Sequence, residues 1–342
     1  LSIQAYDGTE WGEWDSFTLT TEVTLNGAAI KGPLENALVF LDYDNDGVID
    51  ESEPSVRTNA DGIFSLTGLP GYSFTVLTDS ATVDASTGEV LSDVVLKAPN
   101  GSSVISPATT IMEETGLSSI EVATVLGLPN GVDPTQFNPF DDDVDAATAL
   151  IVEKISHQIM TTVTAVQQAI EGSGALSNEA FSIAMTSVGV AVKTNGANGD
   201  VIDFTDAAEL SNLTRIVQSE AANSGNVDLN TFNTIIDDVE AAIINVNIAI
   251  GNASDISSEE SKALFGLSSD LQTQIKAAAE DPNNSKSKIT LANEASDDGT
   301  KPTLVSFSST TANGAYKAGD AINITANMSE AILDGGAIDV TL

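Results

Sequence analysis

Residues 42–53 read DYDNDGVIDESE and carry acidic side chains at a spacing that could hold a calcium ion, Ca2+. Calcium takes about six to eight hard oxygen ligands, and a twelve-residue loop can supply them from positions 1, 3, 5, 7, 9 and 12. The residues of this chain at those positions are, in order, Asp42, Asp44, Asp46, Val48, Asp50 and Glu53. Gly47 falls at position 6, where such a loop turns sharply. The pattern predicts a calcium site in which Val48 supplies its carbonyl oxygen and Asp50 acts through a water molecule.

The flanks of this loop predict that it joins two β-strands. The preceding NALVFL, residues 36–41, is short and rich in strand-forming side chains. The following PSVRTNADGIFSL, residues 54–66, opens with a proline that disfavours a helix and continues as another strand. An EF-hand needs a helix on each side of its loop. A loop between strands would instead brace the fold without transmitting a helix-opening signal.

Three further acidic features have alternative interpretations. FDDDVD at residues 140–145 precedes a predicted helix, where acids complement the positive helix end, and a second calcium site is the alternative. Residues 297–298 lie at a predicted junction between domains, which calcium could stiffen. Asp61, in NADG, is most simply a turn residue.

The motifs of common enzymes are absent from the sequence. It has no GxSxG, no HExxH and no P-loop lysine, so we do not expect an enzyme. The single histidine, His157, lies about 200° around its predicted helix from Ile155. We therefore expect His157 on the surface or on a second helix face rather than as a catalytic base. Trp11 and Trp14 could stack on a sugar, but side chains of this kind more often plug the end of a sandwich.

The composition excludes some classes of partner. Twelve Lys and Arg residues stand against 50 Asp and Glu residues, giving a formal net charge of −38. Nucleic acid and anionic membranes both need a cationic face, so neither is expected as a partner. No run of about 18 apolar residues is present, so no membrane insertion is expected either. The chain has no cysteine, and calcium could take the place of disulfides as a staple.

The apolar pattern changes from strands to helices near Ser106 and Pro107, a good helix N-cap and first helical residue. Residues 22–100 contain short strands separated by Gly, Pro, Asn and Asp. Later residues follow helical spacing, with three long apolar stripes and two further helices expected at 178–193 and 204–222. The stripes are Ala147, Ile151, Ile155, Ile159, Val163, Val166 and Ile170; Phe232, Ile236, Val239, Ile243, Val246 and Ile250; and Leu264, Leu267, Leu271, Ile275 and Ala278.

Several segments resemble parts of large bacterial surface adhesins. Residues 36–69 resemble the calcium-bearing, prealbumin-like β modules of such proteins, sharing the acidic loop, the SEP exit and the Asp-Gly hairpin of TNADGIF. Residues 5–21 resemble the closing strands of a tandem β domain in very large marine adhesins of the RTX type. Residues 301–332 are similar to the opening of an Ig-like extender repeat. Residues 95–116, with 125–140, resemble a helical module that often follows such β modules.

These patterns together predict a mixed multi-domain chain in which antiparallel β-sandwich modules flank an all-α helical bundle. The expected parts are a hairpin of a truncated β-sandwich at 1–21, a prealbumin-like or Ig-like β-sandwich with the calcium loop at 22–102, the helical bundle at 103–281, a linker at 282–300 with one short strand at 289–292, and the first half of an Ig-like sandwich at 301–342. Strands are expected at 2–6 and 16–20. Both ends suggest an internal segment of a longer protein.

The resemblance implies a structural and adhesive segment of an extracellular, calcium-stabilised bacterial surface protein. Its partners would be neighbouring domains of the same chain, neighbouring subunits or a cell-surface ligand. A second hypothesis is a subunit of an extracellular filament or surface layer, assembled by β-strand addition. A third is a carbohydrate-binding module. Calcium-dependent polymers would favour the second hypothesis, and binding to a glycan would favour the third.

Overall fold

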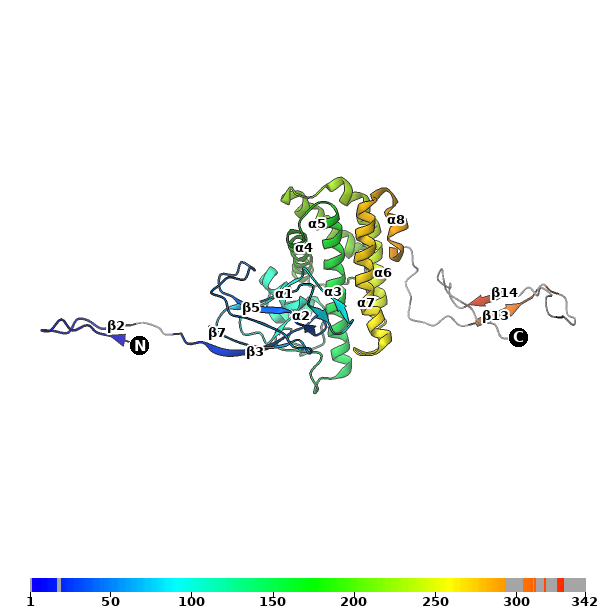
Figure 1. Cartoon of the computed structure of the whole chain (residues 1–342). Helices are drawn as coiled ribbons and strands as arrows, with labels where there is room; N and C mark the ends of the chain where they lie inside the picture. Colours follow the sequence, from blue (N-terminus) through cyan, green and yellow to red (C-terminus); the bar gives the residue numbers. More distant parts are fainter. Residues whose placement is uncertain are drawn as a thin grey trace.

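The structure is a computed structural model that describes residues 2–16, 20–292, 304–309, 311, 317 and 325–328. As predicted, small β-sheets are followed by a bundle of helices (Figure 1). We call β3 to β12 the β unit and α1 to α7 the helical bundle. Among the described helices, none is both long and apolar enough to cross a lipid bilayer.

The β unit contains ten short strands in three sheets. Their bounds are β3 (Val23–Ala29), β4 (Leu34–Glu35), β5 (Leu38–Asp42), β6 (Ser55–Arg57), β7 (Ile63–Gly68), β8 (Ser73–Leu77), β9 (Val83–Asp84), β10 (Glu89–Val90), β11 (Val95–Ala98) and β12 (Val104–Ile105). The sheet orders are β11-β8-β5-β6, β12-β3-β7 and β10-β9-β4. All pairs within the unit are antiparallel except β12 with β3, which is parallel.

Aromatic side chains join the two larger sheets. Strand β7 alternates exposed and buried residues, so Phe64 and Leu66 point into the protein. Phe64 meets Phe74 of β8 edge-on, with ring centroids 5.3 Å apart. This contact packs one sheet on the other, as the strand pattern of residues 22–100 predicts.

The bundle begins where the sequence predicts. Its helices are α1 (Pro107–Thr115), α2 (Ser119–Val125), α3 (Ala146–Gly172), α4 (Ser177–Asn198), α5 (Ala207–Ser224), α6 (Leu229–Gly251) and α7 (Glu259–Glu280). Ser106 accepts a hydrogen bond from the amide of Thr109, whose side chain bonds back to the Ser106 backbone. This capping box, with Pro107 as the first helical residue, fixes the start of α1.

Helix α3 lies at the centre of the bundle and contacts α4, α6 and α7 (Figure 1). The apolar stripe predicted on α6 is buried along its whole length. The α3 stripe is buried from Ile159 to Ile170, whereas Ile151 near the start of the helix is 42% exposed. Helix α1 packs on β11, and one continuous apolar core runs from the β unit into the bundle.

His157 is fully buried, on a second face of α3. The prediction allowed the surface or a second face, and the surface alternative is wrong. Helix α3 is covered on more than one side, so leaving the main apolar stripe does not bring a residue to solvent. The ring of His157 stacks on Phe265 of α7.

The residues after α7 are not an extended linker up to residue 292. They form the 3-10 turn η1 (Pro282–Asn284), helix α8 (Ser285–Lys288) and the 3-10 turn η2 (Thr290–Ala292). The strand predicted at 289–292 is wrong, because Ile289 and Leu291 are buried against the bundle. The side-chain amide of Asn245 also donates to the Leu291 carbonyl at 2.8 Å.

The two terminal strand pairs are short. Strand β1 (Ser2–Ile3) pairs with β2 (Asp15–Ser16). The strand predicted at 2–6 is shorter than expected, and residues 17–19 of the strand predicted at 16–20 lie outside the described residues. Trp11 and Trp14 are more than 60% exposed, which contradicts the prediction that they plug a sandwich. Strand β13 (Leu304–Ser308) pairs with β14 (Thr325–Met328). Most of the half-sandwich predicted at 301–342 lies outside the described residues, as do residues 297–298.

Candidate metal centre

The acidic loop connects two neighbouring strands of one sheet, as its flanks predict. Strand β5 ends at Asp42, and its antiparallel partner β6 begins at Ser55. The amide of Leu41 donates to the carbonyl of Pro54 at 3.2 Å, which closes the base of the loop. The loop is therefore an excursion between paired strands, and no helix flanks it.

Asp42 anchors the loop to the sheet. It is only 1% exposed, and its carboxylate has three donors. Oδ2 accepts from the amide of Gly47 at 2.9 Å and from the hydroxyl of Thr75, in β8, at 3.1 Å. Oδ1 accepts from the amide of Asp46 at 3.1 Å. These hydrogen bonds hold a buried carboxylate in one orientation without a neutralising cation among its donors.

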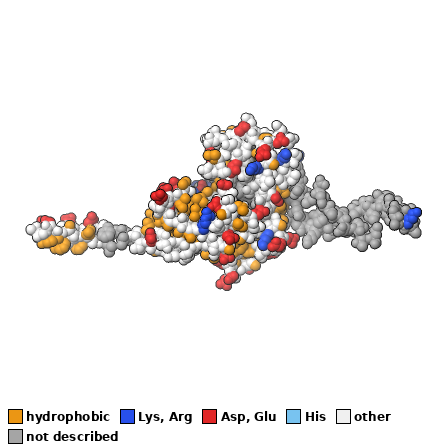
Figure 2. All heavy atoms as spheres, in the orientation of Figure 1, with side chains coloured by type: hydrophobic (Ala, Val, Ile, Leu, Met, Phe, Trp, Pro, Cys, Tyr) orange, Lys and Arg blue, Asp and Glu red, His pale blue; other side chains and the backbone are white. Residues whose placement is uncertain are grey.

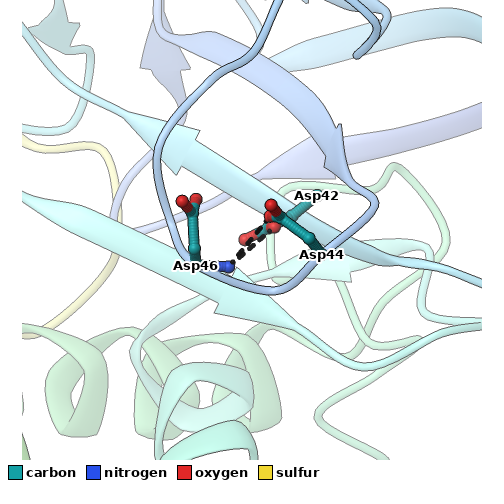
Figure 3. Close-up of side chains that lie close together, drawn as sticks. All are labelled: Asp42, Asp44 and Asp46. Carbon is teal, nitrogen blue, oxygen red and sulfur yellow. Dashed lines mark hydrogen bonds between the residues drawn. The ribbon is translucent and has the colours of Figure 1, made fainter.

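Three predicted ligands come together around this anchor. Asp42, Asp44 and Asp46 each offer a carboxylate oxygen, and the three oxygens lie within 4.8 Å of one another (Figure 3). The backbone turns tightly there, with a φ of 61° at Asn45 and 77° at Gly47. Both values lie in the left-handed region, which glycine and asparagine tolerate best. The turn lets Asp44 and Asp46 face the same side of the loop while remaining exposed.

Glu53, another predicted ligand, bonds to two backbone amides of the loop. Glu53 is 7% exposed, and its Oε1 accepts from the Tyr43 amide at 2.6 Å. Its Oε2 accepts from the Asp50 amide at 2.9 Å. Glu53 thus ties the two arms of the loop together instead of joining the aspartate group. Val48 is 60% exposed and Asp50 is also exposed.

The chemistry of this group suits a hard divalent cation. Three carboxylates within 4.8 Å repel one another, and a cation between them would remove that repulsion. Their oxygens match the preference of calcium, and also that of magnesium, for oxygen ligands. Among the described residues, this is the one group of three or more acidic, histidine or cysteine side chains close enough to share an ion.

Helix α1 adds an acidic neighbour that the sequence did not indicate. Glu113 is half-buried, and its carboxyl lies 3.5 Å from the hydroxyl of Ser73. Burial raises the pKa of Glu113, Lys97 opposes this shift, and the negative charge of Asp42 adds to it. Glu113 follows the loop by some 60 residues, so only the packing of α1 on the sheet brings its charge near Asp42.

The other acidic features are structural within the described residues. Asp145 is the N-cap of α3 and accepts from the amide and hydroxyl of Thr148, both at 2.9 Å. These hydrogen bonds lower the pKa of Asp145. Asp61 occupies an exposed hairpin turn, in which its amide donates to Asn59 Oδ1. Both observations agree with the helix-start and turn interpretations.

No family model, no curated protein and no solved structure matches this chain.

Proposed function

We propose that this chain is a calcium-stabilised structural segment of an extracellular bacterial surface protein that mediates adhesion. The observation that carries the proposal is the grouping of Asp42, Asp44 and Asp46 at the end of β5. Support also comes from the order of residues in the loop, which follows the twelve-position calcium pattern.

The position of the loop explains how calcium would stabilise the protein. Asp42 belongs to β5, pairs across to the hydroxyl of Thr75 in β8, and begins the loop that leads to β6. A cation held by the aspartates would fix the loop on three adjacent strands of the same sheet. Binding to the folded state alone raises the free energy of unfolding, by about 2.7 kcal/mol when the ion is at a hundred times its Kd.

The charge of the chain agrees with a cation-rich environment. The net charge is −38, and Figure 2 shows acidic side chains spread over the visible face of the described residues. Divalent cations would reduce the self-repulsion of such a surface. The partners we propose are neighbouring domains of the same chain or neighbouring subunits, together with a ligand on a cell surface.

The test is thermal unfolding with calcium and with a chelator. We expect calcium to raise the Tm of the wild type but not that of the double variant Asp44→Asn, Asp46→Asn. These two side chains are exposed, so their loss should leave the chelated protein folded. The matched control is Glu259→Gln, Glu260→Gln, an exposed pair at the start of α7 that should keep the calcium response. A wild-type Tm that does not change when calcium is added would contradict the proposal.

A second measurement separates a segment of one long chain from a subunit of an assembly. Light scattering after size-exclusion chromatography reports the molar mass with and without calcium. We expect a monodisperse monomer in both conditions. Regular polymers that form on adding calcium would favour the filament or surface-layer hypothesis instead.

A further inference from the structure

A buried polar network joins the β unit to the helical bundle. On the β side, Lys31 lies in the turn after β3 and is 4% exposed, and Asp84 of β9 is 1% exposed. The Lys31 Nζ and Asp84 Oδ2 atoms are 2.5 Å apart. The hydroxyl of Ser86 donates to Asp84 Oδ1 at 2.6 Å. Lys31 and Asp84 therefore neutralise each other within the β unit.

On the helical side, α3 contributes Glu153 and His157, which are both completely buried. The Nε2 atom of His157 lies 3.0 Å from Glu153 Oε1 and 3.1 Å from Ser86 Oγ. Phe265 of α7 covers the imidazole, with ring centroids 4.1 Å apart and an interplanar angle of 5°. His157 of α3 thus contacts both Ser86 of the β unit and Phe265 of α7. We call this set of five polar residues, with Phe265, the joint.

The hydrogen bonds of the joint define where its protons lie. The one hydroxyl hydrogen of Ser86 points to Asp84, so Ser86 can only accept from the imidazole. The hydrogen of neutral His157 is therefore on Nε2, and Glu153 Oε1 accepts from it as well. A proton on Glu153 then belongs on Oε2, which has no hydrogen-bond partner within the described part of the protein.

A small cavity lies beside this residue. Glu153 and Ser156 line a cavity of about 30 Å3 that is otherwise mostly apolar. Ser156 Oγ is a second buried atom that lacks a hydrogen-bond partner among the described residues. One water molecule needs about 10–15 Å3 of such space, so the cavity is large enough to hold a water molecule beside these residues.

Burial favours the uncharged forms of Glu153 and His157. Burial raises the pKa of Glu153 well above its ordinary value, and the charge of Asp84 adds to this effect. Burial lowers the pKa of His157 well below its ordinary value, and Lys31 lowers it further while Asp84 opposes the shift. The charged groups that face the imidazole are Lys31 and Asp84 from the β unit and Glu153 from its own helix.

We propose that Glu153 holds a single exchangeable proton beside a neutral His157, and that the pair acts as a pH-sensitive latch between the β unit and the helical bundle. With this proton on Glu153 and a neutral imidazole, the pair has no net charge. A second proton leaves a buried positive charge beside Lys31, and loss of the proton leaves a buried negative charge beside Asp84. Either change weakens the joint, because a buried unpaired charge costs several kcal/mol.

The direction of the pH dependence follows from counting protons in the folded and unfolded states. In the unfolded chain the carboxyl titrates at 4.5 and the imidazole at 6.5. Between these values the unfolded pair also holds one proton, so its contribution to stability is constant. Above pH 6.5 the unfolded pair holds no proton while the folded pair keeps one. The folding constant therefore falls about tenfold for each pH unit. Below pH 4.5 the unfolded pair holds two protons and the folded pair one, so stability falls as the pH drops.

The single histidine allows a direct measurement of the latch. NMR of the imidazole reports one signal, because His157 is the only histidine in the sequence. We expect the folded protein to show a neutral Nε2–H imidazole that does not titrate from about pH 5.5 to 7.5. A folded-state titration near the ordinary histidine value would overturn the proposal.

The variant Glu153→Gln separates the latch from the other carboxyl groups of the chain. Glutamine keeps the shape of the side chain but has no proton to lose, so this variant loses the decline in stability above pH 6.5. Relative to the wild type, its folding constant should rise about tenfold from pH 7 to pH 8. The control Glu280→Gln removes an exposed carboxyl at the end of α7 and should follow the wild type at every pH. Parallel pH profiles of the wild type and Glu153→Gln would contradict a proton retained on Glu153.

Hydrogen exchange tests whether the residues of the joint are the ones that lose protection when the pH rises. Peptides covering residues 83–90 and 150–160 should lose protection in the wild type between pH 7 and pH 8, after correction for intrinsic exchange. The same peptides of Glu153→Gln should keep their protection. Unchanged protection in the wild type would overturn the proposed latch. If Glu153→Gln does not fold, the NMR measurement of His157 in the wild type tests the proposal by itself.

Discussion

The hydroxyl of Thr75 donates a hydrogen bond to Oδ2 of Asp42, with 3.1 Å between the two oxygens. Both residues are buried, and they lie on the neighbouring strands β5 and β8. The first acidic residue of the loop is thereby oriented by a strand that contributes none of the predicted ligands. This relationship makes the proposed metal site dependent on the sheet as well as on the loop.

Replacing Thr75 by valine tests this dependence. Without the hydroxyl, the Asp42 carboxylate keeps only its loop amides as donors, and its orientation is less restricted. We expect calcium affinity to fall about tenfold, the lower end of what losing a supporting hydrogen bond costs at metal sites. Isothermal titration with calcium measures the change. The control Thr67→Val lies on the exposed face of β7 and should bind like the wild type.

Replacing Lys31 by methionine should destabilise the protein by about 3–5 kcal/mol, because it leaves Asp84 buried and unpaired. Adding Asp84→Asn should reduce that loss, since the uncompensated charge is removed. Urea unfolding of both variants measures the difference. Equal stability of the single and double variants would contradict the unpaired charge of Asp84 as the cause of the loss.

The loss in Lys31→Met should also depend on pH. In the wild type, burial acts to raise the pKa of Asp84, but Lys31 and the hydrogen bonds hold it below the ordinary 3.8. Asp84 therefore adds stability above that pH and loses it on acidification. Without Lys31 burial dominates, the pKa rises, and the variant instead loses stability as the pH increases. The deficit relative to the wild type should be larger at neutral pH than near pH 3.

Two glycines with left-handed backbones should respond differently to alanine. At Gly47, a Cβ would meet only Lys97 atoms, the nearest at 3.7 Å, so the cost is backbone strain of about 1–2 kcal/mol. At Gly62, a Cβ would lie 2.7 Å from the carbonyl oxygen of Ala29, so a steric clash adds to the same strain. We expect Gly62→Ala to be the more destabilising in urea unfolding. The opposite order would show that the loop at Gly47 is more constrained than its contacts indicate.

A second pair of glycines tests the packing of α3 on α7. A Cβ at Gly172, the last residue of α3, would overlap the Ala279 side chain of α7. Gly172→Ala should therefore cost about 1–3 kcal/mol by overpacking. Gly251 ends α6 with open space around it, so Gly251→Ala should raise stability by up to about 1 kcal/mol. Thermal unfolding of both variants gives the two signs.

Local features of this fold could be predicted because they depend on neighbours in the sequence. The start of α1 at Ser106 and Pro107 is a capping interaction within four residues. The α6 stripe follows the helical repeat, and it is buried along its length. The chain turns at Gly47 because the loop pattern places glycine there. The binding of calcium itself stays a prediction, although Asp42, Asp44 and Asp46 come together as it requires.

The sequence by itself determined the strands, the long helices and the acidic loop, because each follows from contacts between residues a few positions apart. Only the tertiary structure decided which second faces are covered and what the acids bond to. His157 is buried because α7 packs over it, and Ile289 because residues after α7 fold back on the bundle. Glu53 bonds two loop amides, and Glu113 of α1 places its charge near Asp42 of the acidic loop. These contacts join residues far apart in the chain, so no local pattern encodes them.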